Sequence, residues 1–378
     1  MDANKLQLIK PDFDDPITEL VMELDHLRKK QLSGSAHPFM FEQLKRLFHI
    51  LESVDSARIE GNRTTVAEYV EQSLHDDPET EDTRQITNVE DALQYIEEHV
   101  DEIEINHHCI KELHELVVAD LSTARGGEGD RTPGEYRTSD VIIAQAAHIP
   151  PSFMQVQNYM DELVEFINRN DPKQYDLIKV AMAHHRFVWI HPFKNGNGRT
   201  VRLLTYVMLA KSGFNVTANR LINPAAVFHA DRDLYMEMLD KADDYKDASI
   251  KKWCLYFLDG LKSEIEKIDK LTDHAYLMNR VLIPSLRCAL DRKNITLEEY
   301  EVMSLACERQ EIKAADVKEV LGIADSSKVS RLIRSMKDKG MLDNALGAER
   351  IYVPVLFNSF VFRCILGALR EEGFTSAE

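Results

Sequence analysis

A twelve-residue segment combines a histidine, two closely spaced glycines and two arginines, which are residue types able to act on a phosphate-bearing substrate. Residues 191–202 read His-Pro-Phe-Lys-Asn-Gly-Asn-Gly-Arg-Thr-Val-Arg. The side chain of His191 has a pKa suited to taking a proton from a hydroxyl at neutral pH. Gly196 and Gly198 leave room for a ligand to approach the backbone, and the amides there would open a helix whose N-terminus favours an anion. The segment therefore predicts a polyphosphate site beside a base.

Two helices are expected to position this segment. Apolar residues recur near helical spacing over residues 175–190, and a second helical stretch covers residues 199–211. The segment is thus expected in the loop between two helices. Because Arg199 and Arg202 are three residues apart, both guanidinium groups would point from nearly one helical face toward the contents of the loop.

The complete constellation resembles the signature of the Fic family, His-x-Phe-x-Asp/Glu-Gly-Asn-Gly-Arg-x-x-Arg. The matching positions are His191, Phe193, Gly196, Asn197, Gly198, Arg199 and Arg202. Two glycines alone would be weak evidence, because Gly-Asn-Gly is also a common turn. Fic proteins are mostly adenylyltransferases, which move AMP from ATP to a Ser, Thr or Tyr hydroxyl of a protein. The resemblance therefore implies ATP as the substrate.

The resemblance also implies a role for each matching residue. His191 would be the general base, and Phe193 would anchor the loop in the core. The residues expected to hold or neutralise the phosphates are Lys194, Gly196, Asn197, Gly198, Arg199 and Arg202. The two arginines would lie at the far end of the triphosphate.

One position departs from the family signature. Where the family has Asp or Glu to hold a metal ion beside the phosphates, this chain has Asn195. An Asn oxygen can ligate Mg²⁺ or Mn²⁺ without charge, so metal binding should weaken and rely more on phosphate oxygens and water. Three outcomes follow, in descending order of expectation: slower adenylyl transfer, a different phosphate-bearing substrate, or nucleotide binding with little catalysis. Positioning and charge neutralisation by the remaining residues favour the first.

A second stretch looks like the inhibitory motif of Fic proteins, Ser/Thr-x-x-x-Glu-Gly/Asn. Ser56 and Glu60 are four residues apart on a predicted helix that Gly61 can end, so hydroxyl and carboxylate would lie together at the helix end. By the resemblance, Glu60 pairs with Arg202 and holds ATP in a non-productive pose. The plain alternative is a surface Glu before an ordinary C-cap glycine. The sequence leaves open whether the pairing occurs within one chain or across a homodimer.

A third stretch, residues 134–143, resembles the flap of Fic proteins. It is predicted to end in a short strand at 141–143 and to form a hairpin over the active loop. The flap would align the backbone of a target protein by strand addition and present its hydroxyl to the base. Arg137 and Val141 mark the flap. The glycine-rich segment 126–129 before it is expected to be the most flexible turn.

After about residue 290 the pattern changes to three short helices followed by a hairpin. The predicted ranges are 296–307, 313–321, 327–339 and 343–355. This order resembles the winged-helix modules of transcription regulators. The third helix carries a basic stripe made of Lys328, Arg331, Arg334, Lys337 and Lys339. DNA is therefore a candidate partner, and a role in protein contacts or dimerisation is equally open.

Composition restricts the remaining classes of function. The net charge of −18 over 378 residues argues against nucleic-acid binding along the whole chain. The five cysteines form no Cys-x-x-Cys pair, which disfavours a disulfide framework or a thiolate zinc site. His184 and His185 lack further ligands at a fixed spacing, so packed or solvent-facing side chains are expected rather than a metal site. Without a visible secretory signal or a clean membrane span, a cytoplasmic location and no membrane partner are expected.

Together these patterns predict a mainly α-helical fold with a Fic-type helical core, a small β-hairpin flap and a C-terminal winged helix. The expected domains are an inhibitory helical region at 1–83, a catalytic core at 84–290 and a winged-helix-like domain at 291–378. The expected activity is adenylyl transfer to a protein hydroxyl, the chain itself included, autoinhibited by Glu60. Two alternatives are a DNA-binding regulator that senses ATP with a weakly active or inactive core, and an enzyme that removes AMP from a protein.

Overall fold

The computed structural model describes residues 6–29, 38–75, 77–143, 148–214 and 222–375. These residues pack into two units, each built from separated segments of the chain. Unit 1 comprises the described residues of Met1–Gln31, His49–Thr64 and Glu79–Glu266, and unit 2 comprises those of Leu32–Phe48, Thr65–Pro78 and Lys267–Glu378. The predicted domain division at residues 83 and 290 follows the order of elements along the chain and stays a prediction.

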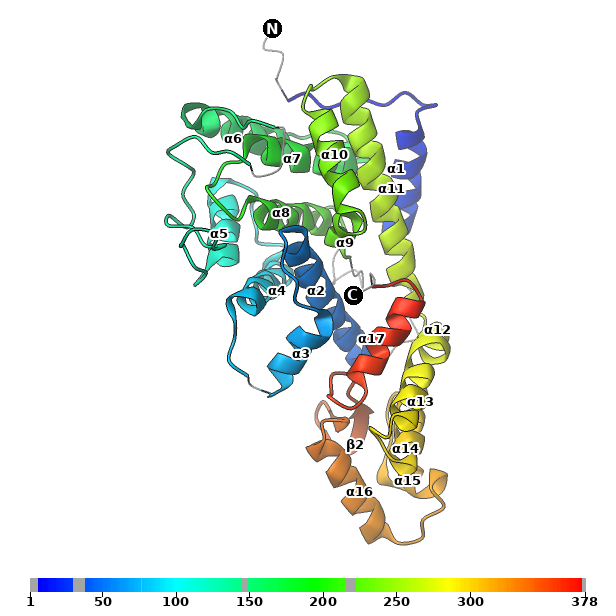
Figure 1. Cartoon of the computed structure of the whole chain (residues 1–378). Coiled ribbons are helices and arrows are strands. Elements are labelled where there is room, and N and C mark those ends of the chain that lie inside the picture. Colours follow the sequence, from blue (N-terminus) through cyan, green and yellow to red (C-terminus); the bar gives the residue numbers. More distant parts are fainter. Residues whose placement is uncertain (1–5, 30–37, 76, 144–147, 215–221, 376–378) are drawn as a thin grey trace. The chain divides into compact units, whose positions relative to one another are not determined.

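Unit 1 is helical (Figure 1). Its elements are α1 (Pro16–Lys29), α4 (Glu81–His99), α5 (His107–Val118), α6 (Phe153–Asn168), the short 3-10 helix η1 (Lys173–Tyr175), α7 (Asp176–Ile190), α8 (Asn197–Lys211), α9 (Pro224–His229) and α10 (Arg232–Ala242). Two long helices, α2 (Pro38–Ile59) and α11 (Asp247–Leu271), have residues in both units. The prediction of a mainly α-helical fold is confirmed. Among the described residues, no helix has both the length and the apolar character needed to cross a membrane.

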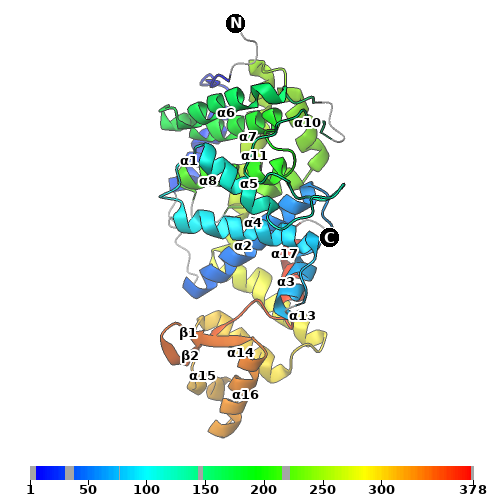
Figure 2. The same ribbon diagram turned by 90° about the vertical axis from the view of Figure 1, so that its left-hand side faces the viewer.

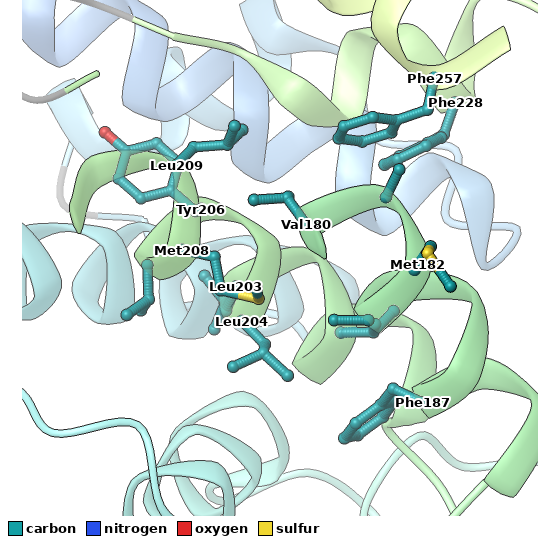
Figure 3. Close-up of a cluster of buried hydrophobic side chains, with 14 of the residues drawn as sticks. Val180, Met182, Phe187, Leu203, Leu204, Tyr206, Met208, Leu209, Phe228 and Phe257 are labelled. Carbon is teal, nitrogen blue, oxygen red and sulfur yellow. The ribbon is translucent and has the colours of Figure 1, made fainter. Parts of the chain in front are cut away.

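Helix α7 packs against both α6 and α8, and almost its whole surface is buried. Figure 3 shows where apolar side chains of α7 and α8 meet Phe228 of α9 and Phe257 of α11. Trp253 of α11 is fully buried nearby, and its indole N–H donates to the carbonyl oxygen of Ala181 at 2.6 Å. Large buried aromatics with a satisfied polar group stabilise a core strongly. The two helices that flank the candidate loop are therefore anchored in the core of unit 1.

Polar caps and a glycine set several helix ends around this core. The side chain of Asn106 accepts from the amide of Cys109 at 3.1 Å and starts α5. Asn223 does the same for α9, where Pro224 fills the first helical position. Gly213 adopts φ +100° just after α8, a conformation that favours glycine and ends the helix.

Unit 2 consists of short helices and one hairpin (Figure 2). Its elements are α3 (Val66–His75), α12 (His274–Tyr276), the π-helical turn η3 (Leu277–Leu282), α13 (Ile283–Asp291), α14 (Leu297–Arg309), α15 (Ala314–Val320), α16 (Ser326–Asp338), β1 (Leu342–Ala345), β2 (Ala348–Pro354) and α17 (Phe362–Glu371). Strands β1 and β2 pair antiparallel, and Ile312 adds a bridge to Tyr352. The three helices and the hairpin predicted after residue 290 are thus present, whereas their assignment as a winged-helix module stays a prediction.

The strand predicted at residues 141–143 is wrong, because these residues have no regular secondary structure. Within the described part of the chain, the sheet consists of β1 and β2 alone. Ile142 is 94% exposed, and an extended segment gains no ladder hydrogen bonds without a neighbouring strand. Residues 144–147, where the predicted hairpin would return, lie outside the described residues.

The C-terminal half of α2 is attached to α9 and α10 by polar contacts. Glu52 is 2% exposed and accepts from the backbone amide of Ala225 at 2.8 Å. The imidazole of His229 lies 3.0 Å from a carboxylate oxygen of Asp55. Arg232 donates through Nε to the last carbonyl of the helix, that of Ile59, at 2.7 Å. These contacts hold the end of α2 against the core of unit 1.

Burial raises the pKa of Glu52 to about 8, although its hydrogen bond from Ala225 opposes the shift. The folded chain therefore keeps this proton up to about pH 8, while the unfolded chain releases it near the ordinary Glu value. The unfolding free energy should consequently fall as pH rises through this window, by up to about 1.4 kcal/mol per pH unit. Glu52→Gln is neutral at every pH and should remove this trend.

The measurement is the melting temperature of both proteins from pH 5.5 to 8.5. The melting temperature of Glu52→Gln should rise relative to that of the wild type as pH rises. Glu98→Gln, at an exposed position on α4, serves as the control and should follow the wild type throughout. A difference between Glu52→Gln and wild type that stays constant with pH would contradict the protonated state of Glu52.

Candidate functional site

Residues 191–196 form the turn between α7 and α8, and residues 197–202 are the first residues of α8. His191 ends α7 in the left-handed conformation, with φ 49° and ψ 62°, and its amide donates to the carbonyl of Phe187 at 2.9 Å. Gly196 has φ 70° and precedes the first residue of α8. Two left-handed residues thus reverse the chain tightly and leave the first amides of α8 facing the loop. Unpaired N–H groups at a helix N-terminus attract an anion.

The loop is closed by side chains of its own and of α5. The side-chain Nδ2 of Asn197 donates to the backbone carbonyl of Phe193 at 2.9 Å, and its Oδ1 accepts from the backbone N–H of Phe193, also at 2.9 Å. The ring of Phe193 is fully buried and stacks on His114 at 3.7 Å between centroids, which confirms its expected place in the core. Because the side chain of Asn197 is used in this way, any contact of Asn197 with phosphate would come from its backbone amide.

His114 also links the loop to the segment predicted as the flap. The amide of Gly134 donates to Nδ1 of His114 at 2.9 Å, and Nε2 lies 3.1 Å from the carbonyl oxygen of Asn195. Since a backbone amide can only donate, Nδ1 is the acceptor and the ring proton is on Nε2. Burial lowers the pKa of His114 to about 4, so the ring is neutral at pH 7.

His191 lines a cavity together with residues of α2, α8 and α10. Its lining includes polar side chains such as those of Glu60 and Arg202 and apolar ones such as that of Met236. Burial lowers the pKa of His191 to about 4, although the carboxylate of Glu60 opposes the shift. His191 is therefore unprotonated at neutral pH. A neutral imidazole beside a cavity can accept a proton, which is the requirement for a general base.

Glu60 occupies the N-terminus of α8 within the same chain. Its Oε1 accepts from Nη2 of Arg202 at 2.7 Å, and a Cβ added to Gly198 would lie 2.0 Å from this oxygen. Ser56 completes the contact, since its hydroxyl and carbonyl accept from Nε and Nη2 of Arg202 at 2.8 and 2.9 Å. Gly61 follows with φ +101° and ends the helix. The residues of the second predicted motif therefore meet those of the first.

The electrostatics of this contact favour a charged carboxylate. Burial would raise the pKa of Glu60, but the charge and hydrogen bond of Arg202 outweigh burial and lower it. Arg202 is 1% exposed, so its charge is balanced inside the protein rather than by water. An anion is thus already bound where the sequence predicts phosphate.

The other arginine of the motif is held by a different acidic residue. Arg199 has no solvent exposure and donates through Nη1 to the carbonyl of Val117 at 3.0 Å. Its Nη2 donates to the carbonyl and to Oε2 of Glu128, at 2.9 and 3.1 Å. Its Nε is buried and has no hydrogen-bond partner among the residues that the structure describes. Both arginines of the motif are therefore paired with carboxylates of the chain itself.

Asn195 faces the glycine-rich segment before the flap. Its Nδ2 donates to the carbonyl oxygens of Gly127 and Gly129, at 3.0 and 3.4 Å. Its Oδ1 accepts from the amide of Gly196 at 2.9 Å. The role of metal ligand stays a prediction, and these three contacts argue against it because they engage both ends of the amide. Lys194 beside it is solvent exposed.

Arg137 braces the flap segment against the loop instead of reaching solvent. Its amide donates to the carbonyl of Pro192 at 2.8 Å, and Nε donates to the carbonyl of His191 at 2.9 Å. Nη2 also donates to the carbonyl of Pro151. Val141 is half-buried and lies in the irregular part of the segment. Arg137 is therefore a marker of the flap that also holds the backbone of the proposed base.

The two histidines of α7, His184 and His185, are buried rather than solvent-facing. His184 lies between the hydroxyls of Thr205 and Tyr235, at 2.8 and 2.9 Å. His185 contacts a carboxylate oxygen of Asp243 at 3.0 Å. The described residues contain no group of three or more His, Cys, Asp or Glu side chains arranged to hold a metal ion. Tyr235 also lines the cavity of His191.

Two residues of the site were not predicted from the sequence. Glu128 lies in a glycine-rich turn, where a single carboxylate belongs to no pattern of spacing. His114 belongs to none of the motifs found in the sequence. Glu128 lies 71 positions from Arg199, so the sequence held no local signal for this contact.

The comparisons with known proteins agree on one family. The family model described as Fic/DOC family matches residues 104–209. A protein adenylyltransferase Fic of Nematostella vectensis is 26% identical over 234 residues, which cover 60% of this chain and 50% of that protein. The Drosophila melanogaster protein of the same name is 31% identical over 172 residues, covering 44% of this chain and 32% of that protein. The chain thus spans half or less of the length of these curated relatives.

Solved structures show the same fold. A Fic family protein from Desulfovibrio desulfuricans G20 is 17% identical, with 93% of this chain and 98% of that chain covered at a TM-score of 0.54. Fic-1 from C. elegans is 19% identical, with 67% of this chain and 71% of that chain covered at a TM-score of 0.52. At these identities the likeness concerns the fold.

Proposed function

We propose, from the premise that residues 104–209 form a Fic/DOC family domain, that this chain transfers AMP from ATP to a Ser, Thr or Tyr hydroxyl of a protein. The observation that carries the proposal is the carboxylate of Glu60 bound to Arg202 at the N-terminus of α8. This site binds an anion, and the neutral His191 lines the same cavity. An anion site beside a neutral base matches the needs of nucleotidyl transfer.

The proposed reaction uses the residues as follows. His191 takes the proton from the target hydroxyl, and the hydroxyl oxygen attacks the α-phosphorus of ATP. The bond from the α-phosphorus to the bridging oxygen breaks, and pyrophosphate leaves with the electron pair. The product is an AMP ester of the protein. Arg199 and Arg202 would neutralise the negative charge of the phosphates once their internal partners are displaced.

The donor set around the loop does not fit a metal ion held by the protein. Asn195 is the residue expected to bind Mg²⁺ or Mn²⁺, and both ends of its amide are engaged by backbone groups. A divalent cation prefers several oxygen ligands, carboxylates above all. An ion accompanying ATP would therefore be held by phosphate oxygens and water, and no step above depends on it.

Autoinhibition by Glu60 is part of the proposal. The carboxylate takes the Nη2 donor of Arg202 and lies against Gly198, so a triphosphate in the same place would meet a negative charge instead of a donor. Two negative charges in contact, here the carboxylate and a phosphate, repel strongly in a buried site. The contact forms within one chain, so inhibition would not require a homodimer.

A regulator that senses ATP without turnover is the second candidate, favoured by the exposed basic residues on α16. The stripe offers fewer unengaged charges than its sequence indicates. Lys328 and Lys339 form ion pairs with Glu298 and Glu299, at 2.8 and 2.6 Å. Arg331 and Arg334 are exposed and would be the residues to contact DNA phosphates.

One experiment separates the two candidates. Glu60→Gly is incubated with ATP and either Mg²⁺ or Mn²⁺, ATP binding is followed by thermal shift, and AMP adducts are detected by intact mass. Transfer predicts both binding and an adduct on the chain or on an added target. Binding without any adduct would favour the regulator. The third candidate activity is removal of AMP from a protein, in which Glu60 would align water. It is tested by intact mass as the loss of AMP from a modified protein, with Glu60 unchanged.

A further inference from the structure

We infer that Glu128 is a second internal competitor for the phosphate site, and that Asn195 is the positioning residue that holds it against Arg199. This inference rests on the proposed function, because it concerns the regulation of the same nucleotide site. It assigns to Asn195 a task that the Asp or Glu expected there could not perform.

The contact of Glu128 with Arg199 resembles the contact of Glu60 with Arg202. Both carboxylates accept from an Nη2 atom, and both side chains are 32% exposed. Both arginines are buried in unit 1 and belong to the predicted phosphate motif. Each arginine that would bind the triphosphate therefore has its own internal anion. Removing Glu60 alone would leave Arg199 paired.

The amide of Asn195 has one orientation that satisfies its neighbours. Nδ2 faces the carbonyl oxygens of Gly127 and Gly129, and Oδ1 faces the amide of Gly196. A rotated amide would set an oxygen against two carbonyl oxygens and an NH₂ group against an N–H. A carboxylate at this position has no donor and would repel both carbonyls. The segment that carries Glu128 is thus tied to the loop by a group that requires Asn.

The glycine-rich segment packs closely against residues 121 and 122, and its expected flexibility stays a prediction. A Cβ at Gly127 would lie 2.2 Å from the carbonyl oxygen of Ser122, and one at Gly129 would lie 2.2 Å from that of Leu121. The amide of Gly129 donates to the carbonyl of Ser122 at 2.9 Å. The glycines allow this close approach, and the backbone then delivers Glu128 to Arg199.

Two further observations indicate that Arg199 is built to bind another anion. Its Nε–H is buried and unpaired among the described residues, so the guanidinium is only partly satisfied by Glu128 and Val117. Burial raises the pKa of Glu128, and the charge of Arg199 only partly offsets this while that of Glu60 adds to it. A carboxylate that is costly to keep charged is one that a phosphate group can displace.

The first test is ATP affinity, measured by calorimetry without divalent metal in the Glu60→Gly background. Adding Glu128→Gln should tighten ATP binding about 10-fold, because a charge-assisted hydrogen bond to the competitor is removed. Glu81→Gln is the matched control. Glu81 lines a pocket together with Glu60 and Glu128, and its Oε1 accepts from the amide of Ser122 at 3.1 Å. It has no contact with Arg199 among the described residues, so its variant should leave the affinity within about 2-fold.

The second test concerns Asn195. In the Glu60→Gly background, Asn195→Ala removes the tether and offers no metal ligand. If Asn195 is a tether, the variant should bind ATP more tightly, by several-fold, in both the presence and the absence of Mg²⁺. If Asn195 were a metal ligand, the variant should bind ATP more weakly with Mg²⁺ and equally without it. The two roles thus predict opposite signs.

The outcomes separate this inference from the proposed function. If Glu128→Gln and Glu81→Gln tightened ATP binding equally, the effect would come from the lower negative charge of the protein as a whole, and the inference would be overturned. No gain from Glu128→Gln, with ATP still bound by Glu60→Gly, would overturn it as well and leave the proposed function intact. Failure of every variant to bind ATP would instead reject the nucleotide site. Adenosine, which lacks phosphates, should bind all variants equally.

Discussion

Glu60→Gly should raise the transfer of AMP onto the chain itself, or onto an added target protein, by about 10- to 100-fold. The substitution removes the carboxylate that accepts from Arg202 and lies against Gly198. A hydrogen bond to a charged group is worth about 1.5–3 kcal/mol, and each 1.4 kcal/mol corresponds to a factor of ten. The measurement is incorporation of label from α-labelled ATP, with intact mass to count adducts.

Ser56→Ala is the matched control on the same helix. It removes one hydrogen bond to Nε of Arg202 and leaves the carboxylate of Glu60 in place. Because the negative charge that competes with phosphate stays in place, the effect on labelling should be about 3-fold or less. Unchanged labelling in Glu60→Gly, together with unchanged ATP affinity, would remove the basis for inhibition by Glu60. If labelling rises only when Glu128→Gln is added, most of the inhibition would come from the contact of Glu128 with Arg199.

His191→Ala in the Glu60→Gly background should lower AMP transfer by about 100- to 10,000-fold, the usual contribution of a positioned general base. ATP affinity should change little, because the proposed phosphate donors belong to α8 and to its two arginines. Transfer is measured by the same labelling assay, and affinity is measured by calorimetry. Loss of transfer without loss of binding would place His191 in the chemical step.

The control for this substitution is His99→Ala, at the end of α4, where the imidazole contacts the carbonyl of Tyr95. It should change neither transfer nor affinity. A His191→Ala variant that still transfers AMP at the rate of its parent would exclude the proposed base. An equal loss of ATP affinity and transfer would mean that the substitution disturbs the loop, since the carbonyl of His191 also accepts from Arg137.

Much of the site could be predicted from the sequence because its parts are local. The histidine, glycines and arginines lie within twelve residues, and their spacing alone places them at a turn between two helices. The same holds for Ser56 and Glu60, which share one helical face. The helices and the hairpin after residue 290 were also predictable, since caps, glycines and apolar periodicity act over a few residues.

The flap shows where local reasoning failed. Apolar residues at 141–143 favour an extended conformation, but a strand also requires a neighbour for its hydrogen bonds. No local pattern states whether that neighbour exists. The contact of Arg137 with the carbonyl of His191 was equally invisible, because the two residues are 54 positions apart.

By itself, the sequence determined which residues lie within one or two helical turns of one another, and from these it predicted an anion site, a base and, through the family resemblance, an inhibitory carboxylate. Only the tertiary structure decided that a second carboxylate, that of Glu128, meets Arg199. Glu128 contacts Arg199 across 71 positions, and Asn195 reaches Gly127 across 68. Such contacts depend on how α5, α8 and the segment between α5 and the flap pack together, and the free energy of that packing is set by the whole core of unit 1 rather than by neighbours in the chain.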